Sequence, residues 1–285
     1  MKAKIKKTIS NFFTPIFSKS AIWKLYKPIA EFNAELYNLK SNLQKDSIYQ
    51  EFVQKFGYLT EKGVRRGPFK GLKYPFKSSV HSTFFPKLLG YYEFEIQKSI
   101  EDLSSNSYSL IVDVGCAEGY YAVGLARLFP DSTLLAYDLL PEAREKTEKL
   151  ARANGIEVSE KFQIKDACLP DDLLSLNPEF RHLIFSDCEG FEAELFTTEV
   201  IKHLRNSDFI IEVHDFIFPG ISDELTARFA ETHKVKIVQS IDDTFRYRFV
   251  EDAELLTFSL SDQIKLLAEK RPSQMEWLVC HTLNK

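Results

Sequence analysis

The sequence predicts a doubly wound α/β fold with a mostly parallel seven-stranded sheet and an N-terminal helical extension. Three observations lead to this fold class. From about residue 108 to the C-terminus, short apolar runs alternate with helix-like segments, which is typical of parallel sheets. The apolar runs are nearly continuous, as expected for strands buried on both faces. Before residue 105 this alternation is missing, and apolar residues such as Ile5, Ile9 and Phe12 recur at helical spacing.

Seven segments are expected to be strands, beginning with LIVDVG and ending with EWLVCHT. They span residues 110–115, 133–140, 162–167, 182–187, 208–215, 234–240 and 276–282. Helices are expected between them, over residues 119–129, 141–154, 190–206 and 221–233, and a further helix over 86–104 leads into the first strand. Pro141 suits the first position of its helix, and Gly155 suits the position after the last turn.

Two parts of the chain differ in charge. Residues 1–105 form a basic, mostly helical extension or cap, and residues 106–285 form the ligand-binding domain, with an insertion near 242–273. Residues 1–80 contain 16 Lys and Arg but only 5 Asp and Glu, a net charge of +11. Because the whole chain has a net charge of −4, the remaining residues carry −15. The basic and aromatic segment 1–30 is expected either to contact an anionic membrane surface or to fold back over the pocket.

Several classes of protein are excluded by composition. No apolar run approaches the ~18–20 residues of a membrane span, and the N-terminus lacks the features of a secretory signal. Four cysteines without a CxxC pair indicate reduced thiols and no zinc site. We therefore expect a cytoplasmic protein, with peripheral contact at the inner membrane face as the added expectation for the basic leader.

Acidic residues stand near the ends of the first three expected strands. Asp113 precedes the turn Gly115-x-x-x-Gly119, which lacks the G-x-G-x-x-G spacing of a pyrophosphate cradle. An acidic rim suits a cationic or amino-bearing ligand instead. Asp138, 19 residues after Gly119, can accept both ribose hydroxyls of an adenosine, and Asp166 is placed to meet the adenine amino group. The alternative is that all three are turn and cap residues.

Together these motifs resemble class I S-adenosylmethionine-dependent methyltransferases, which have a Rossmann-like fold. The sequence D-C-E-G-F-E at 187–192, the E-V-H at 212–214 and the D-V-G-x-x-x-G-Y-Y motif look like the FkbM-like branch. The resemblance covers residues 108–240. It implies S-adenosylmethionine as cofactor and O-methyl transfer, often to sugar hydroxyls of glycans or secondary metabolites.

The resemblance also implies contacts for the loop after the first strand. Cys116, Glu118 and Tyr120 would then lie beside the cofactor with Gly115 and Gly119. Either Tyr120 or Tyr121 could form a cation–π contact with the sulfonium. Cys116 and Glu118 depart from the residues common in the FkbM-like branch. Independently of the resemblance, four basic residues of the extension could bind a phosphate or an acidic sugar of the acceptor: Arg65, Arg66, Lys70 and Lys73.

Four candidates for catalysis follow the fourth and fifth strands. His214 is the expected general base, because an imidazole titrates near neutral pH. Asp187 is expected to orient the acceptor or hold the methionine amino group, and Glu189 lies beside it; Asp215 completes the group. Strand alternation places Glu212 on the same side as His214, where it could orient the imidazole. The four candidates Asp187, Glu189, His214 and Asp215 could instead hold Mg²⁺ or Mn²⁺. Their spacing matches no compact metal motif, so no metal is expected.

The expected partner is a hydroxyl-bearing acceptor, a sugar or a lipid-linked glycan. Two alternatives stay open at this stage. Asp138 also fits an NAD-dependent oxidoreductase, although the missing G-x-G-x-x-G opposes it. A non-enzymatic module that binds anionic surfaces on a relic methyltransferase fold would explain the basic leader. Because no N-P-P-[YF] motif follows the fourth strand, methylation of nucleic-acid bases is not expected.

Overall fold

The structure, a computed structural model, describes residues 53, 62–76, 79 and 83–283. The expectations for the leader 1–30 lie outside these residues. The chain divides into two compact units, Met1–Gly57 and Tyr58–Lys285. Residues 58–105, which the sequence assigns to the extension, thus share a unit with the sheet.

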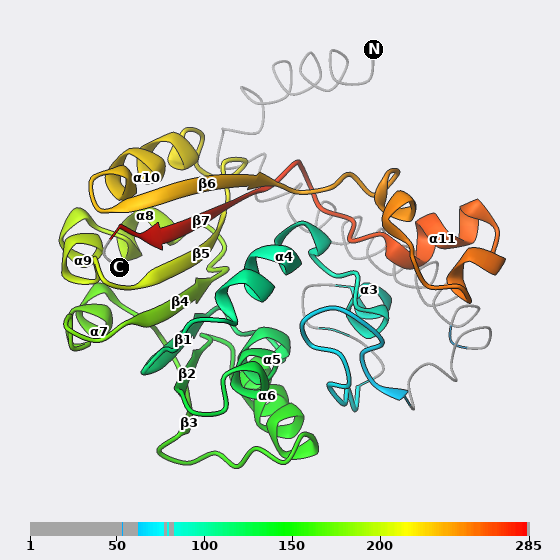
Figure 1. The fold of residues 1–285 in the computed structure, drawn as a ribbon, viewed down its shortest axis with the longest axis horizontal. Helices are drawn as coiled ribbons and strands as arrows, with labels where there is room; N and C mark the ends of the chain where they lie inside the picture. The colour runs from blue at the N-terminus through cyan, green and yellow to red at the C-terminus, as the bar shows by residue number, and fades with distance from the viewer. Residues whose placement is uncertain (1–52, 54–61, 77–78, 80–82, 284–285) are drawn as a thin grey trace, which may run out of the picture. The chain divides into compact units, whose positions relative to one another are not determined.

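The sheet has seven strands in the order β3-β2-β1-β4-β5-β7-β6 (Figure 1). β7 pairs antiparallel with both β5 and β6, and the pairs among β1 to β5 are parallel. This confirms the predicted mostly parallel seven-stranded sheet. The strands are β1 (Leu110–Val114), β2 (Thr133–Tyr137), β3 (Phe162–Lys165), β4 (His182–Ser186), β5 (Asp208–Val213), β6 (His233–Gln239) and β7 (Glu276–Thr282).

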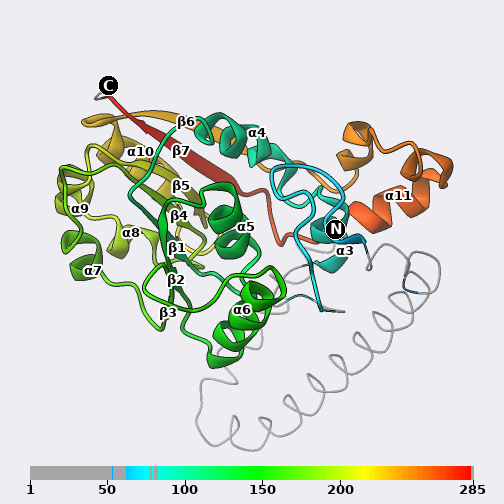
Figure 2. The same ribbon diagram turned by 60° about the horizontal axis from the view of Figure 1, so that its bottom comes forward.

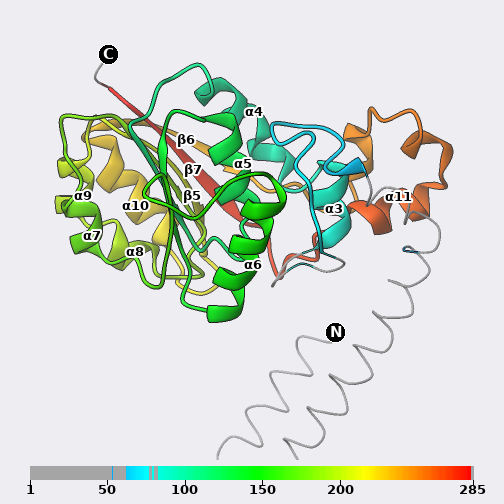
Figure 3. The same ribbon diagram turned by 90° about the horizontal axis from the view of Figure 1, so that it is seen from below.

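Helices cover both faces of this sheet. The helices α7 to α10 lie on one face, and α4 to α6 lie on the other, as the two views of Figures 1 and 3 show. Their bounds are α4 (Phe94–Leu103), α5 (Tyr120–Leu128), α6 (Pro141–Ala153), α7 (Pro170–Leu174), α8 (Glu192–Leu195), α9 (Thr198–His203) and α10 (Ile221–Ala230). α6 begins at Pro141 as predicted, and its ion pairs Glu142–Lys146 and Glu148–Arg152 are formed.

Two expected helices are broken. The helix predicted over 190–206 is divided into α8 and α9, because Thr197 is extended and its side chain caps α9 at the Val200 N–H. The helix predicted over 86–104 becomes α3 (Phe84–Leu89) and α4, because Gly90 turns left-handed after α3. Both breaks follow from residues that favour helix ends over helix interiors.

One apolar core lies between the sheet and the α7–α10 layer. Val112 and Val114 of β1 point into it, with Phe196, Phe209 and Phe229 among its fully buried rings. Asp113, between the two valines, belongs to the opposite face of the strand, where α5 packs. Strand alternation therefore determines which β1 side chains enter this core.

The expected insertion lies between β6 and β7. It contains the short helices η2 (Arg246–Phe249) and η3 (Leu255–Thr257) and the helix α11 (Leu260–Leu267), which lies beside α3 (Figure 2). Arg65 pairs with acidic groups of this insertion, at 3.0 Å from Asp252, and Arg66 lies 3.1 Å from Glu251. The expectation that these arginines bind an acceptor phosphate is therefore replaced by a structural role.

No helix among the described residues is long and apolar enough to cross a membrane.

The turn after β1 approaches the end of β4 very closely. Gly115 has φ +83°, and a Cβ built on it would lie 1.8 Å from the backbone oxygen of Asp187. Only glycine fits, because a side chain would collide with rigid backbone. This contact sets the distance between the two loops that follow β1 and β4.

Gly115→Ala should lower the free energy of unfolding by at least about 3 kcal/mol, since left-handed strain and backbone overlap add together. Gly155→Ala is the matched control, because Gly155 also has positive φ but has open space around it. Its cost should be only about 1–2 kcal/mol. Denaturant unfolding of both variants measures the difference, and equal losses would contradict the proposed overlap.

Candidate functional site

A pocket of about 130 Å³ opens at the carboxyl ends of β4 and β5. Its wall is completed by the start of α4 and by the segment 269–275, between α11 and β7. The predicted groups Asp187, Glu189 and His214 all line it, together with Glu212. The structure therefore brings together the three residues expected to be catalytic, as the open edge of a parallel sheet allows.

His214 is held by a buried carboxylate. Its side chain is 2% exposed, and its Nδ1 lies 2.6 Å from Oε1 of Glu192, which is itself completely buried. A carboxylate can only accept here, so Nδ1 carries the proton and the neutral imidazole presents its lone pair at Nε2. The expectation that Glu212 orients His214 is wrong, because Glu192 occupies Nδ1 and Glu212 is bound elsewhere.

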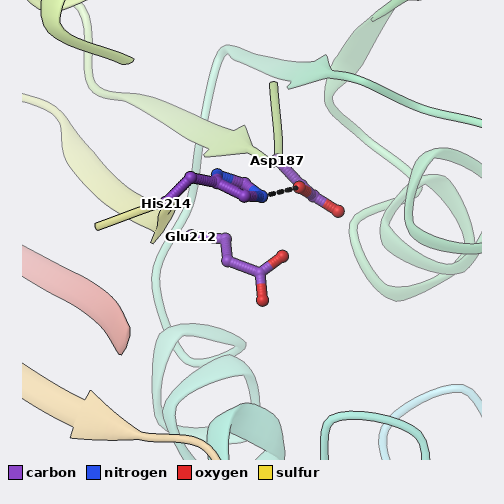
Figure 4. Close-up of side chains that lie close together, drawn as sticks. All are labelled: Asp187, Glu212 and His214. Carbon is purple, nitrogen blue, oxygen red and sulfur yellow. Dashed lines mark ion pairs between the residues drawn. The ribbon is translucent and has the colours of Figure 1, made fainter. Parts of the chain in front are cut away.

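The other imidazole nitrogen faces two carboxylates. Nε2 of His214 lies 3.5 Å from Oδ1 of Asp187 and 3.6 Å from Oε2 of Glu189. Figure 4 shows the imidazole of His214 turned toward Asp187, with Glu212 beside them. The site thus combines one positioned imidazole with two carboxylates at its free nitrogen.

Arg271 connects three separate parts of the chain. Its guanidinium contacts Glu212 on β5, lies 3.0 Å from Glu93 at the start of α4, and lies 2.8 Å from Glu269. All four side chains are largely buried. One cation here balances part of the charge of three carboxylates, which is favourable only because each contact is close and hydrogen-bonded.

The surplus of negative charge shifts the protonation of the pocket. Burial and the charges of Glu93 and Glu189 raise the pKa of Asp187 to about 7. Burial raises the pKa of Glu269 to about 8, although Arg271 opposes the shift. Burial alone would lower the pKa of His214, but the hydrogen bond and charge of Glu192 outweigh it and raise that pKa.

Backbone strain gathers around this pocket. Four described residues other than glycine have positive φ: Glu93, Ala117, Glu189 and Lys270. Three of them line the pocket, and Ala117 lies in the turn after β1. Such conformations cost about 1–3 kcal/mol each and concentrate at functional sites.

A carboxylate beside the turn after β1 is oriented to bind a ligand. Asp138, directly after β2, accepts hydrogen bonds of 2.8 Å from the N–H of Ala117 and from the N–H of Leu140, one on each oxygen. Each oxygen keeps a lone pair, so the oriented carboxylate can still accept two ribose hydroxyls. Such an oriented acceptor fits the ribose hydroxyls of an adenosine without phosphates.

Two other predicted cofactor residues are Asp113, in β1, and Asp166, directly after β3. Asp113 is 1% exposed, and burial together with the charge of Asp138 raises its pKa to about 8. Its Oδ2 has no hydrogen-bond partner among the described residues. Asp166 is exposed and accepts from the N–H of Ala167, which lowers its pKa and makes it a turn residue in the absence of ligand.

Glu118 does not offer a free carboxylate to a ligand. It is completely buried, 2.6 Å from Nζ of Lys87, and Tyr74 donates a hydrogen bond to it. Burial alone would raise the pKa of Glu118, but Lys87 outweighs burial and lowers it. This corrects the expectation of direct cofactor contact: Glu118 fastens the turn to the segment before α4.

Cys116 and Tyr120 are also packing residues. Cys116 is buried with its Sγ 3.5 Å from Oγ1 of Thr147, and burial raises the pKa of its thiol. Tyr120 is 4% exposed and packs edge-to-face against Phe69, with ring centroids 5.4 Å apart. The expected cation–π contact of Tyr120 is therefore replaced by packing against aromatic neighbours.

A metal ion is a weaker interpretation of the site. Single ligand atoms of Asp187, Glu212 and His214 lie within 4.8 Å of one another, and imidazole with carboxylates is a common donor set. However, Glu212 already binds the guanidinium of Arg271, which would repel a divalent cation. Asp215 does not join the cluster, because its carboxylate accepts from the Gly220 N–H.

Sequence reasoning missed three residues of the site. Glu192 stands in the D-C-E-G-F-E motif, so its place five residues after Asp187 was a usable signal. Glu93 and Arg271 lie in segments with no motif, and only the ion pairs of Arg271 with Glu93 and Glu212 reveal them.

No protein-family model matches the sequence, and no curated protein matches it. Among solved structures, the chain is similar to precorrin-6y C5,15-methyltransferase from Geobacter metallireducens, with 9% identity, 65% of this chain and 88% of that chain covered, and a TM-score of 0.41. It is also similar to ribosomal protein L11 methylase from Lactobacillus delbrueckii subsp. bulgaricus, with 15% identity, 67% and 79% coverage, and a TM-score of 0.40. An rRNA methylase from Streptococcus thermophilus gives 13% identity, 66% and 97% coverage, and a TM-score of 0.40.

The Glu192–His214 contact makes a prediction about titration. By NMR of the imidazole nitrogens, His214 should have a pKa above 6.5, the ordinary value, and carry its proton on Nδ1 when neutral. Glu192→Gln should lower this pKa, because it removes both the charge and the charge-assisted hydrogen bond. Glu194→Gln, on the same helix α8 but exposed, should leave it unchanged. An unshifted His214 in Glu192→Gln would contradict the assignment.

Proposed function

We propose that this chain is an S-adenosylmethionine-dependent O-methyltransferase that acts on a hydroxyl of a glycan, a glycolipid or a related small acceptor. The supporting observation is the arrangement of one sheet edge. There the oriented carboxylate of Asp138 lies beside the Gly115–Gly119 turn, and the free Nε2 of His214 opens into a pocket after the neighbouring strands. The FkbM-like motifs and the methyltransferases among the similar structures agree with this proposal.

S-adenosylmethionine, when bound, supplies an electrophilic methyl group. Asp138 would hold its ribose, and the turn after β1 would face its methionine part. Gly119 keeps this turn close to α6, since a Cβ there would lie 2.9 Å from Thr147. Without phosphates to neutralise, an acidic rim is compatible with a sulfonium ligand.

His214 would act on the acceptor. Its lone pair at Nε2 can receive the hydroxyl proton during methyl transfer, while Glu192 stabilises the imidazolium that forms. Asp187 and Glu189, next to Nε2, can position the acceptor by accepting hydrogen bonds from its other polar hydrogens, since the one O–H hydrogen of the reacting hydroxyl is donated to Nε2. The pocket walls keep the acceptor in line, and such orientation can supply ~7–11 kcal/mol.

Asp138→Ala should weaken binding of S-adenosylhomocysteine at least tenfold, or ~1.4 kcal/mol, because the ribose hydroxyls lose their acceptor. Titration calorimetry measures this change. Asp131→Ala is the matched control, since Asp131 is exposed and precedes the opposite end of β2; it should bind as the parent protein does. Unchanged affinity in Asp138→Ala would reject the ribose assignment.

Thermal unfolding with S-adenosylmethionine or with NAD separates the two enzyme classes. Preferential stabilisation of the folded protein by S-adenosylmethionine supports the methyltransferase, and a gain of about 2.7 kcal/mol is expected at a ligand concentration of 100 times Kd. Preferential binding of NAD would support an oxidoreductase, and binding of neither would favour the non-enzymatic alternative.

His214→Ala should lower kcat on a hydroxyl acceptor by roughly 10²–10⁴-fold while leaving the affinity for S-adenosylhomocysteine nearly intact. The parent rate should rise with pH as His214 loses its proton, with a midpoint above 6.5, since its pKa is raised. Transfer of a labelled methyl group across a pH series measures both effects. A pH-independent parent rate, or an unchanged rate in His214→Ala, would exclude this base; loss with EDTA and recovery with Mg²⁺ would instead indicate a metal.

A further inference from the structure

The carboxylates of the pocket divide into two groups. Glu93, Glu212 and Glu269 all bind Arg271. Asp187 and Glu189 form no ion pair with Lys or Arg among the described residues; the imidazole of His214 lies 3.5 and 3.6 Å from them. Oδ1 of Asp187 is buried without a hydrogen-bond partner in the described part of the chain. These two carboxylates can therefore accept hydrogen bonds from a ligand.

A buried side chain points at the same place. His214 is 98% buried, its Nδ1 is committed to Glu192, and its Nε2 makes no hydrogen bond to a described residue. With a neutral imidazole, Nε2 and both carboxylates are acceptors, and acceptors cannot satisfy one another. The missing component is a group rich in donors with positive charge.

An aromatic side chain lines the same pocket. Phe216 lines it, is 45% exposed, and has its ring 5.9 Å from the imidazole of His214. Phe218 and Ile217 lie exposed in the same loop and close over Gly190, where a Cβ would be 3.0 Å from the Phe218 ring. Aromatic faces attract organic cations and pack against ring carbons.

We propose that the acceptor carries a positively charged amino group next to the hydroxyl that is methylated, so that Asp187 and Glu189 bind the ammonium and Phe216 packs against the carbon skeleton. This inference rests on the proposed function, because it places the hydroxyl at Nε2 of His214. It names the substrate class as amino alcohols, with amino sugars as the members that also fit a glycan acceptor.

The arrangement disfavours acidic acceptors. Arg271, the buried cation of the pocket, is bound by three carboxylates and has little capacity left for a phosphate or carboxylate. Lys270 also lines the pocket, but its side chain is exposed at the rim. An acidic group at Nε2 of His214 would lie beside Asp187 and Glu189 and be repelled.

The cofactor is a second source of an ammonium group, through its α-amino group. Saturating the full chain with S-adenosylhomocysteine, which carries the same amino group, separates the two sources. If the carboxylates serve the cofactor, the bound product occupies them and any preference of a probe for positive charge disappears.

Three probes of one shape test the proposal. They are trans-2-aminocyclohexanol, trans-cyclohexane-1,2-diol and trans-2-hydroxycyclohexanecarboxylate, each titrated by NMR into the full chain saturated with S-adenosylhomocysteine. The amino alcohol should bind at least tenfold tighter than the diol, and the hydroxy acid should bind more weakly than both. Equal binding of the amino alcohol and the diol, tighter binding of the acid, or no binding of the amino alcohol would overturn the proposal.

Variants separate charge from packing. Glu189→Gln should reduce the preference for the amino alcohol over the diol at least fivefold, whereas the exposed control Glu194→Gln should retain it. Phe216→Ala should weaken the amino alcohol and the diol by similar factors. A preference unchanged in Glu189→Gln would overturn the role of this carboxylate. Failure of S-adenosylhomocysteine to bind would reject the proposed function separately, and the probe preference would then be measured on the protein alone.

Discussion

The contact of one guanidinium with three carboxylates brings the parts of the site together. Arg271 comes from the segment before β7, Glu93 from the start of α4, and Glu212 from the end of β5. Without the cation, these carboxylates would repel one another in a poorly solvated place, and the walls of the pocket would separate. The pocket therefore exists as a consequence of charge balance across distant parts of the chain.

The charge of Arg271 does not balance all the carboxylates of the pocket, and the chemistry of the site follows from the two that it does not bind. Arg271 leaves Asp187 and Glu189 at the free nitrogen of His214, where the pKa of Asp187 is raised to about 7. The pocket can relieve its excess charge by taking up protons or by binding a cation. Glu192 fixes the tautomer of the neutral imidazole and stabilises the imidazolium, since its own carboxylate is completely buried and accepts from the N–H of Gly190.

A second buried ion pair holds the opposite side of the site. Lys87, on α3, and Glu118, in the turn after β1, are 2.6 Å apart and almost inaccessible to water. The segment before the sheet is thereby joined to the turn that would face the cofactor. Removing one partner of such a pair is costly, because the other charge remains buried.

Much of this protein was determined by the sequence itself. Strands, their parallel arrangement and the helix beginning at Pro141 follow from apolar periodicity and local backbone preferences, which act within a few residues. The grouping of Asp187, Glu189 and His214 was predictable because parallel strands end at one edge. The partner of His214 was decided by tertiary structure: alternation indicated Glu212, but the turn at Gly190 brings Glu192 to Nδ1 and Arg271 binds Glu212. Likewise, Glu118 and Cys116 became buried, and Arg65 and Arg66 paired with the insertion, because ion pairing and burial depend on which surfaces meet in space, and local sequence does not encode those distances.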